Sequence, residues 1–155
     1  MTRLPLLTVT SSKQWEAVVS PIRLELWEFL RSNGPCSVRE LAGQMERPAD
    51  GLYHHLRKLI TAGLIRETDR RPAGTQIESI YDVVAEDLHF PLHLEQSRNR
   101  RWISKLFQAV IRCAGRTVQA ALDLGTEADL KSSHRPFSVR WDVGWLSDAD
   151  LQQVR

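Results

Sequence analysis

The strongest constraint on the fold is a pair of short amphipathic helices predicted between residues 37 and 62. The first helix begins with a capping box, Ser37-Val38-Arg39-Glu40, in which the serine and glutamate side chains can each accept from the other residue's backbone N–H. The second helix begins at Pro48 and is closed by Gly63. The apolar positions of the two helices are Val38, Leu41, Ala42, Met45, Leu52, Leu56, Leu59 and Ile60. Two short helices joined by a turn of about three or four residues form a helix-turn-helix unit.

A further helix is predicted directly before this unit. Ser20 suits its N-cap, and Pro21 suits the first helical position, where the missing N–H of proline costs nothing. The helix ends at Asn33-Gly34-Pro35, because glycine can adopt the left-handed cap and proline prevents continuation. Residues 1–12, at the start of the chain, are predicted to form a loose arm.

Two strand-like runs, residues 64–68 and 76–84, follow the helix pair, and the second is rich in Ile, Tyr and Val. The segment between them, residues 69–74, reads Asp-Arg-Arg-Pro-Ala-Gly and is both basic and turn-forming. A β-hairpin directly after the second helix of a helix-turn-helix unit is called a wing. The sequence therefore predicts a winged helix-turn-helix domain over residues 13–84.

The remaining residues, 85–155, are predicted to form a C-terminal region that begins with a long helix from about residue 94 to residue 124. Apolar residues recur along this helix at intervals of three and four. Residues 137–143 alternate between apolar and polar side chains, which indicates a strand, and Ser147-Asp148-Ala149-Asp150 indicates the start of a last short helix. The expected fold class is mainly α with a small β-hairpin wing (α+β).

The apolar stripe of the long helix can be interpreted in two ways. It is either core for the C-terminal region or a dimerisation surface. The rest of the sequence suggests no partner of comparable length, and exposure of the stripe would cost about 25 cal/mol per Å². Dimerisation is therefore favoured, through Trp102, Ile103, Leu106, Phe107, Val110 and Ile111.

Composition and motifs exclude several classes of function. The formal net charge of +2 neither requires nor excludes a nucleic-acid partner. The two cysteines, Cys36 and Cys113, form neither a disulfide framework nor a paired-cysteine zinc motif. The apolar run at residues 4–9 is broken by Pro5 and is too short to span a membrane. From the cysteine pattern and this short run we expect a cytoplasmic protein without a membrane partner. The sequence contains no phosphate-binding loop or catalytic motif, so we expect neither enzymatic activity nor a cofactor.

Three motifs together resemble a known family. Ser20-Pro21 is followed by Arg23, the first helix of the pair contains Glu40-Leu41-Ala42, and the second ends in the segment His55–Leu64, which reads HLRKLITAGL. In this combination the segment from Ser20 to Val84 resembles the winged-helix repressors of the ArsR type. The resemblance implies a homodimer that binds a two-fold or nearly two-fold symmetric site on double-stranded DNA. The helix at about residues 48–62 would enter the major groove, and the wing tip at residues 69–74 would lie along the backbone or in the minor groove.

The resemblance also implies roles for individual side chains. The residues placed to face bases are Ala49, Asp50, Gly51, Tyr53 and His54, and those placed to meet phosphates are Arg57, Lys58, Arg70 and Arg71. Asp50 differs from the small hydroxyl and amide residues common at this place. It could accept from a cytosine amino group, but stabilisation of the helix N-terminus is the favoured interpretation.

For the residues that could bind a metal ion or a small-molecule effector, packing is the favoured interpretation. ArsR-type sensors with a cysteine pair carry it on the helix that begins near Cys36, but Arg39 stands where the second cysteine would be expected, and one thiolate does not make a soft-metal site. His89 and His93 have helical spacing, yet Pro91 disfavours a helix there, so no metal site is expected. The aromatic residues Phe137, Trp141, Trp145, Trp102 and Phe107 form either a core or a pocket for a small-molecule effector, and a core is favoured. A winged-helix protein–protein interaction module remains the main alternative to DNA binding.

Overall fold

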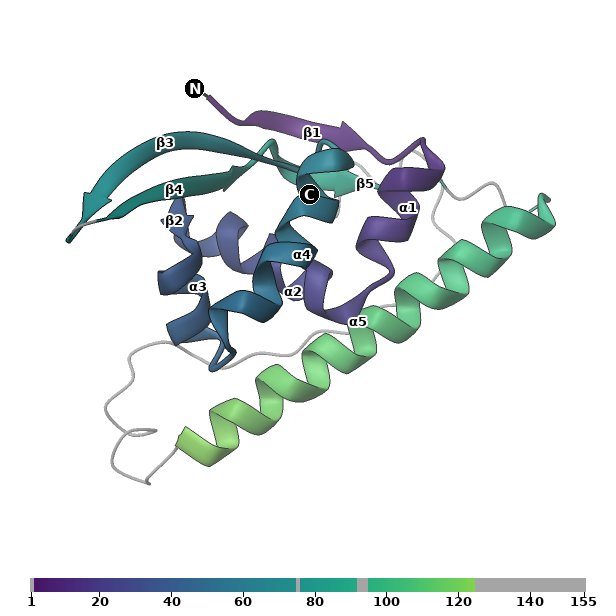
Figure 1. Cartoon of the computed structure of the whole chain (residues 1–155). Coiled ribbons are helices and arrows are strands. Elements are labelled where there is room, and N and C mark those ends of the chain that lie inside the picture. The colour runs from purple at the N-terminus through teal and green to yellow at the C-terminus, as the bar shows by residue number, and fades with distance from the viewer. Residues whose placement is uncertain (1, 75, 92–94, 125–155) are drawn as a thin grey trace. The chain divides into compact units, whose positions relative to one another are not determined.

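The structure is a computed structural model that describes residues 2–74, 76–91 and 95–124 (Figure 1). The chain divides into two compact units, residues 1–120 and 121–155, and nearly all described residues belong to the first. The elements are β1 (Leu4–Thr8), α1 (Ser12–Val18), α2 (Pro21–Asn33), β2 (Cys36–Ser37), α3 (Val38–Gln44), α4 (Ala49–Thr61), β3 (Ile65–Ala73), β4 (Gln76–Val83), β5 (Ala85–His89) and α5 (Ser97–Leu124). The α+β class with a winged helix-turn-helix arrangement is confirmed. None of the described helices has the length and apolar character needed to cross a membrane.

The capping box of α3 and the glycines that follow α2 and α4 are found as predicted, whereas α4 begins at Ala49, with Pro48 as its N-cap, and α5 begins at Ser97 rather than at about residue 94. The Ser37 hydroxyl accepts from the N–H of Glu40 at 3.3 Å, and the Glu40 carboxylate accepts from the N–H of Ser37 at 2.7 Å. Gly34 and Gly63 follow α2 and α4 with φ angles of 88° and 69°, a backbone conformation that glycine adopts without steric cost. Ser20 does occupy the N-cap of α2, but its side chain makes no capping hydrogen bond.

The wing is longer than predicted. Strands β3 and β4 pair from Ile65 and Val83 at the base to Ala73 and Gln76 at the tip, so most of the segment expected to be a turn belongs to β3. The antiparallel sheet has the order β2-β4-β3, which leaves β3 at an edge. Pro72 is tolerated within β3 because an edge strand can leave one backbone position without a ladder hydrogen bond.

The expectation of a loose arm at residues 1–12 is wrong. β1 pairs in parallel with β5, from Leu4 opposite Ala85 to Thr8 opposite His89. Arg3, just before β1, donates to both carboxylate oxygens of Asp82, at 2.7 to 3.2 Å, and to Glu86 at 3.1 Å. The same guanidinium donates to the carbonyl oxygens of residues 30 and 31 at the end of α2, where the helix dipole favours a cation.

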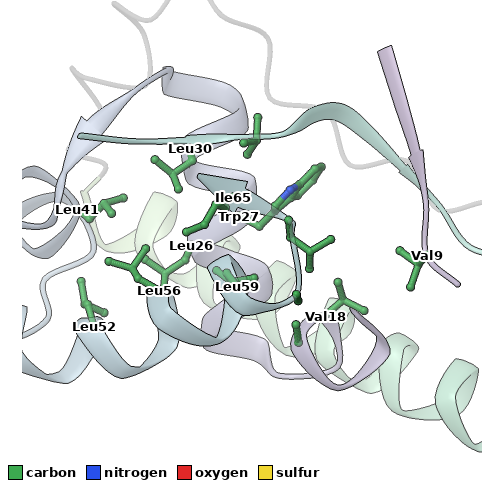
Figure 2. Close-up of a cluster of buried hydrophobic side chains, with 14 of the residues drawn as sticks. Val9, Val18, Leu26, Trp27, Leu30, Leu41, Leu52, Leu56, Leu59 and Ile65 are labelled. Atoms are coloured by element: carbon green, nitrogen blue, oxygen red, sulfur yellow. The ribbon is translucent and has the colours of Figure 1, made fainter. Parts of the chain in front are cut away.

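One hydrophobic core joins the helices to the base of the wing. Figure 2 shows Leu52, Leu56 and Leu59 along one side of α4, near Leu26 of α2 and Ile65 of β3. All five side chains are buried. Leucines at intervals of four and three lie on one face of a helix, so this packing determines which side of α4 remains exposed.

Part of α5 also packs on this core, which corrects the expectation that the chain offers its stripe no partner. Ile103 and Leu106 are 9% exposed and belong to the core cluster, with Trp102 packed partly against it. Phe107 and Ile111, farther round the helix and nearer its C-terminal end, are 46% and 53% exposed. The stripe therefore has an inner side that serves the core of its own chain and an outer side that is exposed.

Several predictions fall outside the described residues and stay predictions. They are the strand at residues 137–143, the last helix from Ser147, and the core, or alternatively effector pocket, formed with Phe137, Trp141 and Trp145.

The buried ion pair predicts a large effect of Arg3. Replacing Arg3 with Ala leaves the carboxylate of Asp82, which is only 4% exposed, without its cation. We expect the free energy of unfolding to fall by about 3 kcal/mol, measured by urea denaturation. The matched control is Glu28→Gln, which breaks the more exposed pair with Arg31 and should cost less than about 1 kcal/mol. Equal losses in the two variants would contradict the role assigned to Arg3.

Candidate nucleic-acid interface

The outward side of α4 presents most of the residues predicted to face bases. Asp50, Gly51, Tyr53 and His54 are exposed, and Ala49 is half-buried against the core. Pro48 occupies the N-cap without a side-chain hydrogen bond, and Asp50 is the acidic residue of the first turn. A carboxylate at this place stabilises the positive end of the helix dipole, which is consistent with the favoured interpretation of Asp50.

A groove runs between this part of α4 and the wing. It has a volume of about 410 Å³. Its lining comes from the start of α3, the first turns of α4 and strand β4, and includes Arg39, Asp50, Tyr53 and Glu78. The predicted base-facing residues of α4 and the wing are thus neighbours on one surface.

The two basic residues at the end of α4 are separated by the fold. Arg57 and Lys58 are both exposed, but consecutive helix positions point about 100° apart. Lys58 lines a different groove of about 580 Å³, together with Lys13 of α1 and Lys105 of α5. Arg57 is therefore the better candidate for a phosphate bound beside the wing.

Both wing arginines are engaged with carboxylates. Arg70 forms an ion pair with Glu67 at 2.6 Å, and this contact raises the pKa of Arg70 and lowers that of Glu67. Arg71 forms ion pairs with Glu40 of α3 at 2.7 Å and with Glu78 of β4 at 3.8 Å. The hydrogen bond from Arg71 is the main cause of the lowered pKa of Glu40.

The two adjacent histidines of α4 lie in different environments. His54 is exposed, whereas His55 is half-buried and its Nδ1 is buried without a hydrogen-bond partner among the described residues. The pKa of His55 is lowered, mainly by burial and further by the positive charges of Arg23, His54 and Arg47. His55 is therefore placed for packing rather than for contact with DNA, and of the two histidines only His54 is turned outward.

The cysteines do not come together. Cys36 is buried in β2, where burial raises the pKa of its thiol to about 11, and Cys113 lies on α5 and donates to the carbonyl oxygen of Pro21. Arg39, at the place where a second cysteine would be expected, forms an ion pair with Glu78 at 2.9 Å. In the described part of the chain, no three His, Cys, Asp or Glu side chains are grouped to hold a metal ion.

The sequence analysis did not identify the carboxylates that pair with Arg3, Arg39 and Arg71. Glu78 and Asp82 lie on the same face of β4 as the buried Ile80, because alternate residues of a strand share a face. Acidic side chains on the inward face of a strand require cationic partners. The acidic residues at alternate positions of β4, on either side of Ile80, could therefore have indicated these ion pairs. Glu25 of α2, which accepts from Arg47 at 3.5 Å and from Arg116 at 2.9 Å, gave no local signal.

Residues 18–68 match the family model of a helix-turn-helix domain, a span that covers α2, α3 and α4. Among solved structures, the transcriptional regulator homologue protein from Pyrococcus horikoshii OT3 is 18% identical with a TM-score of 0.39, over 63% of this chain and 86% of that one. RV1404 from Mycobacterium tuberculosis is 18% identical with a TM-score of 0.30, over 79% and 69%. The disulfide-formed AbfR is 17% identical with a TM-score of 0.31, over 79% and 70%. These scores are too low to transfer any site to this chain. No curated protein matches it.

The lowered pKa of His55 predicts a pH dependence of stability. The folded state resists protonation of His55, so neutral His55 stabilises the folded state relative to the unfolded chain. This contribution to the free energy of unfolding is fully present above about pH 6.5 and is lost as the pH falls through the folded-state pKa. We expect the free energy of unfolding of the wild type to decrease as the pH falls below about 6.5. This decrease should be weaker in His55→Gln and retained in His54→Gln. A slope that survives unchanged in His55→Gln would refute the assignment.

Proposed function

We propose that this protein is a sequence-specific, DNA-binding transcription regulator that acts as a homodimer. The observation that carries the proposal is the exposed side of α4, which lies within the segment that matches a helix-turn-helix domain, beside the projecting wing that follows it. An α-helix fits the major groove of B-DNA, and the wing then reaches the neighbouring backbone or minor groove. The ArsR-type branch is part of this proposal and rests on the motif at His55–Leu64.

The exposed residues divide by chemistry into two roles. Tyr53 and His54 are the side chains of α4 placed to reach base edges. Ala49 and Gly51 are small enough to allow close approach of the first turn, and Asp50 either stabilises the helix N-terminus or accepts from a cytosine amino group. Arg57 and the wing arginine Arg70 are the cations placed to meet phosphates, and Lys58 is set apart by its groove with α1 and α5. Phosphate contacts position a protein on DNA, whereas base contacts select the sequence.

The outer side of α5 supports the dimer. Phe107, Val110 and Ile111 are 36% to 53% exposed and follow one another along a single side of the helix. Exposed apolar residues that cluster in this way are typical of an interaction surface. Two copies of α5 that bury these residues against each other would place two α4 helices on one DNA molecule.

A protein–protein interaction module is the second candidate. Asp50, Glu67 and Glu78 lie on or near the surface that would face phosphates, and Arg70 and Arg71 already have carboxylate partners. Such an acidic contribution lowers affinity for any polyanion. The two candidates differ in whether DNA is bound at all.

Selection of bound fragments from a random DNA library decides between them. A dimeric regulator should enrich a two-fold symmetric site whose halves are about 34 Å, one helical turn, apart or a multiple of that. Arg57→Ala should weaken binding to selected and unselected DNA alike, whereas Tyr53→Ala and His54→Ala should weaken it mainly for the selected site. No enrichment would reject DNA binding and favour the interaction module.

The dimer is tested by one substitution on α5. Wild-type chains of 17.8 kDa should form dimers by multi-angle light scattering at micromolar concentration, and Ile111→Asp should shift them to monomers, because a carboxylate is costly to bury in an apolar interface. Ile77→Asp, at a residue of β4 that is 74% exposed, is the matched control and should leave the dimer intact. A monomeric wild type would contradict the dimer, and a dimeric Ile111→Asp would place the interface elsewhere.

A further inference from the structure

The two adjacent arginines of the wing face opposite sides of β3, because consecutive residues of a strand alternate. Arg70 has a single carboxylate partner, Glu67 of its own strand, and the Arg70 side chain is 71% exposed. Arg71 lies toward α3 and is less exposed, at 45%, with carboxylates from two other elements around it. The two arginines are therefore unequal, although they are adjacent in a basic segment.

Arg71 belongs to a row of four alternating charges, Arg39, Glu78, Arg71 and Glu40, which we call the wing network. Arg71 and Glu78 are direct cross-strand partners in the register of β3 and β4. Glu78 also accepts from Arg39 at 2.9 Å and is only 16% exposed. The row begins and ends on α3, so it connects the wing to the first helix of the helix-turn-helix unit at two points.

The α3 end of the network is itself held in place. One carboxylate oxygen of Glu40 accepts from the N–H of Ser37 in the capping box, and the other accepts from Arg71. Ser37 belongs to β2 and is paired with Ile80 of β4. Glu40 is thus fixed by the same sheet that carries the wing, and it presents a stationary anion to Arg71.

Movement of Arg71 onto a DNA phosphate would be unfavourable. It would leave Glu78, which is only 16% exposed, and Glu40, which is fixed in the capping box, with one cation, Arg39, close to the arriving phosphate. Two like-charge contacts would then replace two attractive ones. Arg70 would give up only one exposed pair on its own strand, and such pairs contribute little. Arg70 can therefore exchange its partner for a phosphate, and Arg71 is held back from doing so.

We propose that Arg71 is a positioning residue that holds the wing against α3 through Glu40 and Glu78, and that Arg70 alone neutralises a phosphate at the wing. This proposal rests on the DNA-binding function proposed above. It assigns different roles to two arginines that the sequence could not distinguish. It also gives Glu40, Glu78 and Arg39 a role in DNA binding without any contact with DNA.

The two roles differ in their effect on the salt dependence of DNA affinity. The slope of log K against log salt concentration is proportional to the number of phosphates that the protein neutralises. For the selected site, Arg70→Ala should reduce the slope of log K against log salt concentration by about 0.9 per wing, or about two per dimer. Arg71→Ala should weaken binding at every salt concentration and leave the slope at its wild-type value. Equal flattening in the two variants would overturn the proposal.

Release of Arg71 provides the converse test. The double variant Glu40→Gln with Glu78→Gln removes both carboxylates, and glutamine can still complete the capping box. The freed Arg71 should then steepen the slope by about one per wing. Because Glu78 also releases Arg39, the same double variant with Arg39→Ala added should keep this steepening, and its loss there would assign the extra phosphate contact to Arg39. Glu46→Gln is the matched control: Glu46 is exposed between α3 and α4 and pairs with neither wing arginine, so the slope of this variant should stay at the wild-type value. A steepening as large in Glu46→Gln would show a general charge effect and reject the release of Arg71.

A measurement without DNA separates this proposal from the function on which it rests. Hydrogen exchange of the β3 and β4 amides should be faster in Arg71→Ala than in the wild type, because the wing loses its attachment to α3, and unchanged in Arg70→Ala. Unchanged exchange in Arg71→Ala would reject the positioning role even if DNA binds. Absence of DNA binding by the wild type would reject the proposed function and the phosphate role of Arg70, and exchange would still decide whether Arg71 holds the wing.

Discussion

Two carboxylates on the inward face of β4 organise the part of the chain that the structure describes. Asp82 attracts Arg3, which brings β1 alongside β5 and places a cation at the end of α2. Glu78 attracts Arg39 and Arg71, which join α3 to the wing. Charges so poorly hydrated are costly without partners, so each carboxylate constrains where its arginines, and the elements that carry them, can lie.

The exposure of α4 follows from packing rather than from charge. Leu52, Leu56 and Leu59 are at most 2% exposed, and burying them turns Tyr53, His54 and Arg57 outward. The chain then reverses at Gly63, and Leu64 and Ile65 return it to the same core before β3 leaves as the wing. The base of the wing is thus fixed by apolar burial and its outer half by the wing network, which is why the network matters for the wing and not for α4.

Local signals in the sequence were sufficient for α2, α3 and α4, and insufficient for what depends on distant partners. The capping box at Ser37 and the glycines at 34 and 63 act within a few residues, so they could be recognised directly. β1 could not, because its stabilising contact joins Arg3 to Asp82, 79 residues away. The basic segment at residues 69–74 indicated DNA contact for both arginines, but the partners that distinguish Arg71 from Arg70 lie on α3 and β4.

Distant contacts also explain why the sequence predicts a single dimerisation surface for the apolar stripe of α5. Helical periodicity shows that Ile103, Leu106, Phe107 and Ile111 lie within a broad apolar stripe, but not that the stripe divides between two partners. The inner side is also tied to the helix-turn-helix unit by charge, because Glu25 binds Arg116 of α5 and Arg47, which lies just before α4. A change in how α5 packs against the rest of its own chain would therefore alter the contacts of Arg47. Through Glu25, the helix that carries the proposed dimer surface is connected to the start of the helix proposed to enter the DNA groove.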